Sequence, residues 1–173
     1  MMSDASRPKL RVITGNVVSA QGRLRSVDEA LAKSVGHEVT NAGFTLERNV
    51  VVRGEAAHLR ELVQLLSNEN QADAVILVGG TGFGPHDAVC EALDPFFEKR
   101  IEGFAEAYRR TLRTDHGVHA MLARATAGVF NQCVVFALTG RPEDVLVAVQ
   151  VLITPTLTAA IDLANGRPAS PRS

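Results

Sequence analysis

The sequence predicts an α/β fold: a three-layer α/β/α sandwich with a mainly parallel central sheet. Segments with strand-like patterns alternate with segments of helical periodicity, which is typical of helices packed on a parallel sheet. The apolar run AVILV at 74–78 is typical of a central parallel strand that is covered on both faces. With 173 residues, 46% apolar and 21% charged, the chain has enough apolar side chains for a core. We expect one domain over residues 1–173, with flexible ends at about 1–8 and 167–173.

The first half of the chain predicts two strands around one helix. The first strand is KLRVIT at 9–14. Ser26 and Glu29 fit a capping box at the start of the helix, and Gly43 fits a left-handed cap at its end. The apolar side chains on one face of this helix are Val27, Leu31, Val35 and Val39. The β-branched segment TLERNVVV at 45–52 predicts the second strand.

The second half predicts more helices around two strands. The apolar stripe of the next helix consists of Leu59, Leu62, Val63 and Leu66. After the strand at 74–78, short helices are expected near 89–94 and 103–113, followed by a fourth strand at 133–138. A long helical region at 142–165 begins with a proline, which the first turn tolerates, and Pro155 is expected to kink or split it.

Composition excludes several classes of function. A formal net charge of −1 gives no electrostatic reason to expect binding to nucleic acid or a membrane surface. Without Trp and with one Tyr, the chain lacks the aromatic platforms of single-strand binders. No secretory signal and no segment long enough to span a bilayer is found. Cys90 and Cys133 are expected to be reduced and buried in a cytoplasmic protein.

Polar, turn-forming residues follow three of the predicted strands. These residues are Thr14-Gly15-Asn16, Gly79-Gly80-Thr81-Gly82 and Thr139-Gly140. In sheets of this type, ligands bind beyond the carboxyl ends of the strands. The three segments therefore predict a binding site at that edge of the sheet.

Four glycines within residues 79–84 make the second segment the main candidate. Glycines after a strand let successive backbone N–H groups form an anion-binding nest. Thr81 adds a hydroxyl, and Asp87 can hold Mg²⁺ or orient a phosphate-bearing ligand. The segment matches neither the P-loop nor the dinucleotide pattern. On spacing alone, a tight turn whose glycines only permit close packing explains it equally well.

A family resemblance covers about residues 9–166. GGTGFGPHDAVCEALDPFFEKRIEGFAEAYRRTL at 79–112 resembles the signature region of the MoaB/MogA family of molybdenum cofactor biosynthesis proteins. LARATAGVFNQCVVFALTG at 122–140 and ITPTLTAAIDLANG at 153–166 are similar to later segments of that family. The resemblance implies a protein that binds molybdopterin, assembles as a homotrimer or homohexamer, and works with other proteins of the pathway. The active branch transfers AMP from Mg-ATP to the terminal phosphate of the pterin.

The resemblance also implies roles for particular residues. The glycine segment would accept the molybdopterin phosphate or the pterin edge, and Asp87 would be the catalytic residue and the Mg²⁺ ligand. The other residues expected to bind the ligand are Thr14, Gly79, Gly80, Thr81, Gly82 and Gly140.

Several positions depart from the active branch. Arg53 stands where an acidic residue is usual, and a cation cannot coordinate Mg²⁺. His86 replaces an arginine, Ala123 a serine and Thr139 a proline, and Arg141 follows the Thr-Gly pair. Two readings follow: a MoaB-type protein that binds molybdopterin with Mg-ATP-dependent adenylylation, or a non-catalytic pterin-binding or scaffold protein. If the chain belongs to the MoaB-like branch, Arg53 and Arg141 are candidates to bind phosphate, although solvated surface positions are the commoner fate of arginine.

The remaining candidates have ordinary explanations. His116 and His119 have a spacing that could join two metal ligands on a helix, but no third ligand is evident, so surface or core histidines are expected. His86 beside Asp87 is either an acid–base group or a hydrogen-bond donor to the ligand. The aromatic residues expected in the core or in a subunit interface are Phe96, Phe97, Phe104 and Phe130.

Overall fold

In the computed structural model, which describes residues 10–18, 29–68, 72–138 and 141–169, six strands form one sheet in the order β2-β1-β3-β6-β5-β4. The strands are β1 (Arg11–Val18), β2 (Thr45–Arg53), β3 (Ala74–Val78), β4 (Lys99–Arg100), β5 (Thr126–Phe130) and β6 (Cys133–Leu138). The first four in this order are parallel, and β5 pairs antiparallel with both β6 and β4. The predicted mainly parallel sheet is confirmed.

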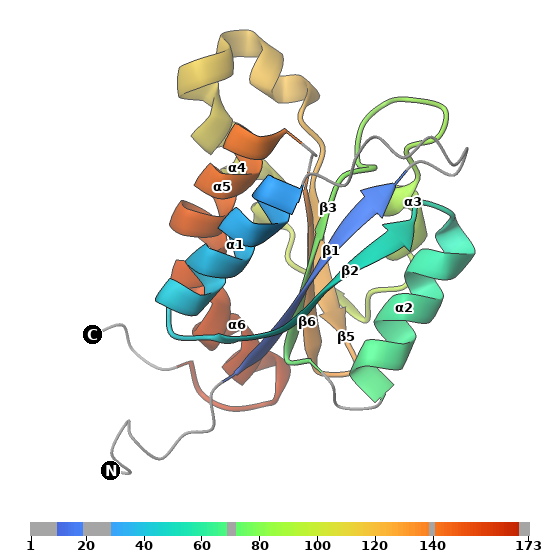
Figure 1. Cartoon of the computed structure of the whole chain (residues 1–173), viewed down its shortest axis with the longest axis vertical. Helices are drawn as coiled ribbons and strands as arrows, with labels where there is room; N and C mark the ends of the chain where they lie inside the picture. Colours follow the sequence, from blue (N-terminus) through green and yellow to red (C-terminus); the bar gives the residue numbers. More distant parts are fainter. Residues whose placement is uncertain (1–9, 19–28, 69–71, 139–140, 170–173) are drawn as a thin grey trace.

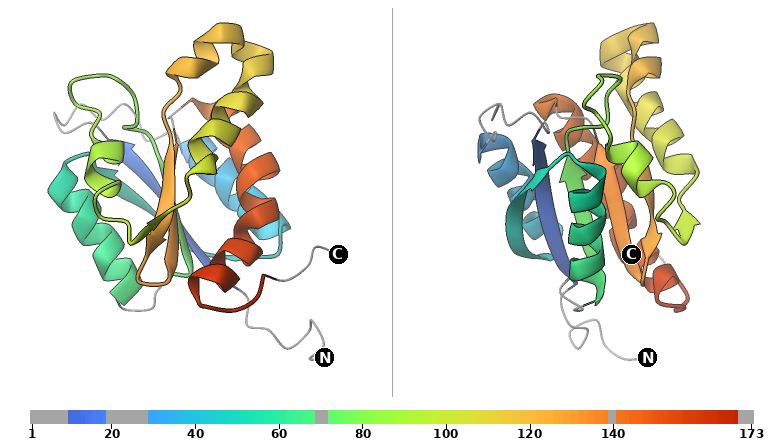
Figure 2. Two further views of the ribbon diagram at one scale, coloured as in Figure 1. Left: turned by 180° about the vertical axis from the view of Figure 1, so that it is seen from behind. Right: turned by 90° about the vertical axis from the view of Figure 1, so that its right-hand side faces the viewer.

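Helices cover both faces of the sheet (Figures 1 and 2). The helical segments are α1 (Glu29–Asn41), α2 (Ala56–Asn68), α3 (Val89–Leu93), α4 (Gly103–His116), the 3-10 helix η2 (Gly117–Leu122), α5 (Pro142–Ala148), the π-helical η3 (Val149–Ile153) and α6 (Thr154–Ala164). Helices α1, α4, α5 and α6 pack on one face, while α2 and α3 pack on the other, each over its own apolar cluster. The three-layer sandwich is therefore confirmed.

Strand β3 connects the two clusters. All five of its side chains are buried. Because successive side chains of a strand point to opposite faces, Ile76 packs toward α1 and α5, while Val75 and Leu77 pack toward α2 and α3. This explains why the sequence needed a continuous apolar run here rather than an alternating one.

The end of α1 is built as predicted. Gly43 has φ +90°, in the left-handed region. The N–H of Gly43 donates to Thr40 O at 3.0 Å, and the N–H of Phe44 donates to Val39 O at 3.2 Å. These are the two bonds of a Schellman motif, and they satisfy carbonyls at the helix end. Ser26, from the predicted capping box, lies outside the described residues.

The structure corrects two expectations about strands. Strand β1 continues past Thr14 to Val18, and Thr14 pairs with Ile76 inside the sheet. The prediction that Thr14 stands at the end of its strand is therefore wrong. Strands β4 and β5 were not predicted; β5 forms a hairpin with β6 through Asn131 and Gln132, which have φ of 46° and 64°. Two successive positive φ values are typical of a turn that matches the strand twist, although glutamine is an uncommon residue for it.

Pro155 interrupts the last helix without ending it. The helix continues from Pro142 to Ala164, and the five residues before Thr154 adopt π-helical geometry. The Thr154 hydroxyl donates to Val149 O at 3.0 Å in this region. The continuous helix has 23 residues and contains an 18-residue window with mean hydropathy 1.8, so by length and composition it could cross a membrane. The expectation that no segment is long enough to do so is therefore wrong. The buried side chains of this helix pack in the core on the sheet, so this is weak support for a membrane span.

Candidate functional site

The glycine loop, residues 79–88, connects β3 to α3 at the edge of the sheet where the parallel strands end (Figure 1). Gly79 has φ +102° and Gly80 has φ +68°, conformations that residues with a side chain rarely adopt. A Cβ atom on Gly79 would lie 2.9 Å from Val17 O, and one on Gly80 would lie 2.7 Å from Val89 Cγ2. These two glycines therefore let the loop pass close to β1 and α3.

Asp87 folds its carboxylate back into the glycine loop. The N–H of Gly84 donates to Asp87 Oδ2 at 3.0 Å. A Cβ atom on Gly82 would lie 2.6 Å from that oxygen, and one on Gly84 would lie 2.9 Å from it. Gly82 and Gly84 therefore leave room for the carboxylate, which orders the loop. The Mg²⁺-binding and catalytic roles of Asp87 stay predictions.

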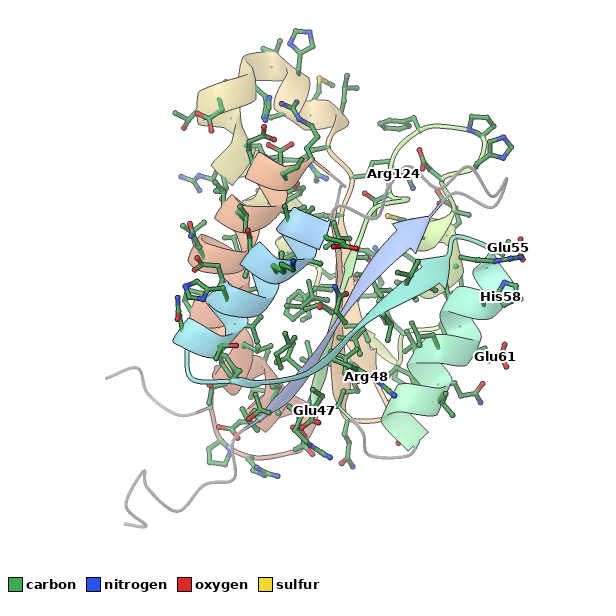
Figure 3. All side chains as sticks on the ribbon, viewed as in Figure 1. Glu47, Arg48, Glu55, His58, Glu61 and Arg124 are labelled. Carbon is green, nitrogen blue, oxygen red and sulfur yellow. The ribbon has the colours of Figure 1, made fainter. Side chains whose placement is uncertain are left out.

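Arg124, just before β5, ties the glycine loop to α3. Its Nη1 donates to Gly82 O at 2.8 Å, and its Nη2 forms an ion pair with Glu91. The guanidinium also lies 5.2 Å from the centre of the exposed Phe83 ring. Hydrogen bonding from Arg124 lowers the pKa of Glu91, so both groups are charged at neutral pH. In Figure 3, Arg124 lies at the same edge of the sheet as the loop.

A cavity of about 240 Å³ opens between the glycine loop and the end of α4. Its apolar lining consists of Leu112, Ala120, Leu122 and Ala123, and its polar lining of Thr81, Gly82, His116, His119, Arg124, Arg141 and Asp144. Thr81 is only 1% exposed, and its hydroxyl has no hydrogen-bond partner among the described residues. A buried hydroxyl without a partner costs stability unless something else binds it.

His116, Asp144 and Arg141 form a charged cluster in the cavity wall opposite the loop. His116 Nε2 lies 2.6 Å from Asp144 Oδ1, and Arg141 Nε lies 3.4 Å from Asp144 Oδ2. Arg141 Nη1 lies 3.4 Å from His116 Nδ1. The Asp144 side chain is only 6% exposed, and burying a carboxylate costs free energy. The contacts with His116 and Arg141 offset this cost.

The structure brings only part of the predicted site together. Thr81 and Gly82 line the cavity, and Gly79 and Gly80 shape the loop that carries them. Thr14 is buried within β1 and is not among the cavity-lining residues. Gly140 and Thr139, the third predicted segment, lie outside the described residues.

The positions that depart from the resembled family pattern fall in different places. Ala123 lines the cavity, where a serine would have added a hydroxyl. His86 is exposed in the glycine loop, and Arg53 is exposed at the end of β2. Neither of these two side chains is among the cavity-lining residues. Of the two arginines suggested as phosphate ligands, only Arg141 faces the cavity.

Sequence reasoning missed three contributors to the site. From the sequence alone, Arg124 is assigned no role, and His116 is expected to be an ordinary histidine. Asp144 was not considered, because nothing in the local sequence connects it with a histidine 28 positions earlier. Its place in the first turn of a helix that follows a strand of the sheet was the available signal.

The cysteines are structural, as expected. Burial raises the pKa of Cys90 to about 11 and that of Cys133 to about 12, so both thiols stay protonated at neutral pH. Within the part of the chain that the structure describes, no group of three or more His, Cys, Asp or Glu side chains is placed to hold a metal ion.

Comparisons with known proteins identify the family. A model described as a probable molybdopterin binding domain matches residues 12–159. The molybdenum cofactor biosynthesis protein B of Bacillus subtilis (strain 168) is 36% identical over 121 residues, which cover 69% of this chain and 71% of that protein. Its namesake from Escherichia coli (strain K12) is 30% identical over 137 residues, covering 79% and 76%. A crystal structure of a molybdenum cofactor biosynthesis protein B matches the fold with a TM-score of 0.83, at 24% identity, over 92% of this chain and 98% of that one. The chain therefore belongs to the molybdopterin-binding domain family, together with the molybdenum cofactor biosynthesis proteins B.

Proposed function

We propose that this protein acts in molybdenum cofactor biosynthesis by binding molybdopterin in the cavity between the glycine loop and the end of α4. The single observation that carries the proposal is the Thr81 hydroxyl, which is buried at the cavity without a partner among the described residues. A polar group kept in such a position gains a hydrogen bond when a ligand enters, because none of the described residues provides one.

The lining of the cavity suits the two ends of molybdopterin. The apolar side chains Leu112, Leu122 and Ala123 can pack against a flat pterin ring. Arg124 and Arg141 can balance the charge of the terminal phosphate, and arginine suits phosphate because its planar group donates two parallel hydrogen bonds. A ligand with one aromatic and one anionic end therefore matches this lining better than a purely apolar one.

Mg-ATP-dependent adenylylation of that phosphate is the second part of the proposal. Asp87 is the residue that would hold Mg²⁺, which neutralises charge on the reacting phosphates when bound. Magnesium is commonly held by one or two carboxylates together with substrate phosphates. Asp87 lies in the glycine loop that carries the lining residues Thr81 and Gly82, and it could supply one of these carboxylates, although it does not itself line the cavity. Because Arg53 replaces an acidic residue and Ala123 a serine, a non-catalytic pterin-binding role is the alternative.

Replacing Thr81 tests the binding site. Thr81→Val keeps the shape and removes the unpartnered hydroxyl, so the free protein should be as stable as the wild type or slightly more stable. Its affinity for molybdopterin, titrated anaerobically by pterin fluorescence, should fall by about tenfold, the equivalent of one ordinary hydrogen bond. Thr81→Ser keeps the hydroxyl and is the matched control. Equal affinities for all three proteins would refute the site.

A turnover assay with molybdopterin, ATP and Mg²⁺ separates the enzyme from the binding protein. The enzyme forms adenylylated pterin and pyrophosphate, and Asp87→Asn abolishes both products while binding persists. If the wild type binds but forms no product, Arg53→Asp tests whether the missing acid is the cause. No gain of product in that variant would support the non-catalytic role.

We also infer a homotrimer or homohexamer in the cytoplasm that exchanges its ligand with other proteins of the pathway. Exposed apolar side chains that such an assembly could cover include Val151 and Leu163 on the last helix and Val51 on β2. Light scattering coupled to size-exclusion chromatography measures the state directly, and a monomer at micromolar concentration would contradict the inference.

A further inference from the structure

The cluster of His116, Asp144 and Arg141 contains a titratable group that the proposed function does not use. The His116 side chain is 19% exposed, and Arg141 is 61% exposed at the mouth of the cavity. Asp144 lies behind them and contacts each through a different oxygen atom. The buried carboxylate therefore fixes the positions of two groups that face the cavity.

The contacts of His116 indicate which ring nitrogen carries the proton when the side chain is neutral. An arginine side chain can only donate, so in the contact between Arg141 Nη1 and His116 Nδ1, at 3.4 Å, the histidine nitrogen accepts. The proton of neutral His116 is therefore on Nε2 and is donated to Asp144 Oδ1 at 2.6 Å. With one arginine and one carboxylate, the three groups then have no net charge.

Protonation of His116 changes this balance. The added proton occupies Nδ1, which then faces the Arg141 guanidinium as a second donor. The cluster gains a net charge of +1, and two cations stand side by side. An anion that accepts from both groups removes this conflict, because it replaces a donor–donor contact with two charge-assisted hydrogen bonds.

We propose that His116 and Arg141, both held by Asp144, form a subsite for a dianionic phosphate or sulfate group, and that binding there takes up one proton at His116. The proton comes from solvent and binds Nδ1, and one oxygen of the anion accepts from Nδ1–H and another from the guanidinium. The inference rests on the proposed function only for its natural ligand, which would be the terminal phosphate of molybdopterin.

Other charged groups around His116 do not change the sign of this linkage. From η2, His119 lines the same cavity, and from the segment before β5, Arg124 does so too. Strand β5 itself, residues 126–130, has no charged side chain. The exposed charged neighbours in sequence on α4 and α5 are Arg113, Asp115 and Glu143. Arg124 adds to the attraction for an anion. His119 is the other cavity-lining histidine whose protonation could respond to a bound anion, so it is the control for His116.

The role fits binding better than acid–base catalysis. In the proposed adenylyl transfer the nucleophile is a phosphate oxygen that has already lost its proton, and phosphoryl transfer depends mainly on positioning and charge stabilisation. His116 would therefore be a binding residue that favours a dianionic phosphate over neutral or singly charged groups.

Sulfate titrations of the full-length protein test the subsite, because sulfate stays dianionic across the range in which histidine titrates. Ring signals of the five histidines are followed by NMR from pH 5.5 to 8.5, with and without sulfate, and assigned through single His→Gln variants. We expect sulfate to move the titration midpoint of His116 to higher pH. Sulfate affinity should weaken by up to about tenfold per pH unit as His116 loses its proton.

Variants identify the group responsible. His116→Gln should leave weak sulfate binding without pH dependence, Arg141→Gln should weaken binding at every pH, and His119→Gln should behave as the wild type. An unmoved His116 signal in sulfate, or an equal pH dependence in His116→Gln, would overturn the proposal. Should His116→Gln fail to fold, the wild-type NMR titration decides alone.

The same titrations separate this inference from the proposed function. If sulfate shifts His116 but molybdopterin does not bind, the subsite stands and its assignment to molybdopterin is wrong. If molybdopterin binds while sulfate leaves His116 unchanged, the proposed function stands and the subsite is wrong.

Discussion

Replacing Arg124 with alanine should release the glycine loop from the rest of the fold. The substitution removes the bond from Nη1 to Gly82 O at 2.8 Å, the ion pair with Glu91 and the contact with the Phe83 ring. Each of these contacts joins the loop or α3 to the segment before β5. Without them, Asp87 and its bond from the Gly84 N–H hold the loop from within.

The size of the effect follows from the exposure of each partner. A hydrogen bond from a charged donor contributes about 1.5–3 kcal/mol, and the lower value applies because Arg124 is partly exposed. The ion pair with the exposed Glu91 contributes about 0–1 kcal/mol. The contact with Phe83, also exposed, contributes about 0.5–1 kcal/mol. A total of about 2–3.5 kcal/mol predicts that the loop opens roughly 30- to 400-fold more often.

Amide hydrogen exchange measures this opening residue by residue. Exchange of the hydrogen-bonded loop amides of Gly84 and Asp87 should accelerate in Arg124→Ala by that factor, while the buried strand β3 should keep its protection. Glu91→Gln is the matched control, because it removes only the ion pair and should accelerate exchange by fivefold or less, on the order of 1 kcal/mol. Unchanged loop exchange in Arg124→Ala would show that the arginine does not order the loop.

Three further predictions concern the backbone and the titrating groups. Gly79→Ala should lower the free energy of unfolding by about 1–3 kcal/mol, because residue 79 has φ +102° and its Cβ would lie 2.9 Å from Val17 O. Urea titrations measure this change. Gly103→Ala is the control, because a Cβ at that position meets nothing within 4 Å. Cys90 is buried, so it should react with thiol reagents only when the protein unfolds. Burial also raises the pKa of its thiol from 9.0 to about 11. Because the thiol of the unfolded chain loses its proton first, the free energy of unfolding should fall as pH rises through that interval. The hydrogen bond from Arg124 lowers the pKa of Glu91, so the pair stabilises the loop at neutral pH. This contribution is lost as pH falls below 4.5, because Glu91 then becomes protonated. At that pH, amide exchange of the loop, corrected for intrinsic rates, should be equal in the wild type and in Glu91→Gln.

The architecture was accessible from the sequence because its signals are local. The apolar run at 74–78 and the apolar stripes of the helices each depend on residues close together in the chain. The end of α1 could be predicted from Gly43 alone, because the left-handed conformation found there favours glycine. The hairpin of β5 and β6 was missed because its turn uses Asn131 and Gln132 rather than a pair containing glycine. Thr14 was misplaced because a strand continues through a Thr-Gly-Asn segment when both neighbouring strands pair with it.

The candidate site was only half accessible. Glycines after a strand mark a loop that approaches something closely, and the structure shows that for Gly82 and Gly84 this is the carboxylate of Asp87. Arg124 reaches the loop across 42 positions of sequence, and His116 reaches Asp144 across 28. Contacts between residues so far apart in the sequence arise from the topology of the sheet. They therefore cannot be predicted from the spacing of residues along the chain.

The most direct test of the central claim is a crystal structure of the protein with molybdopterin bound. The account predicts the pterin ring against Leu112 and Ala123, the Thr81 hydroxyl bonded to the ligand, and the terminal phosphate beside an arginine of the cavity, either Arg124 or Arg141. Molybdopterin bound at another surface, with the Thr81 hydroxyl still unpartnered, would contradict it.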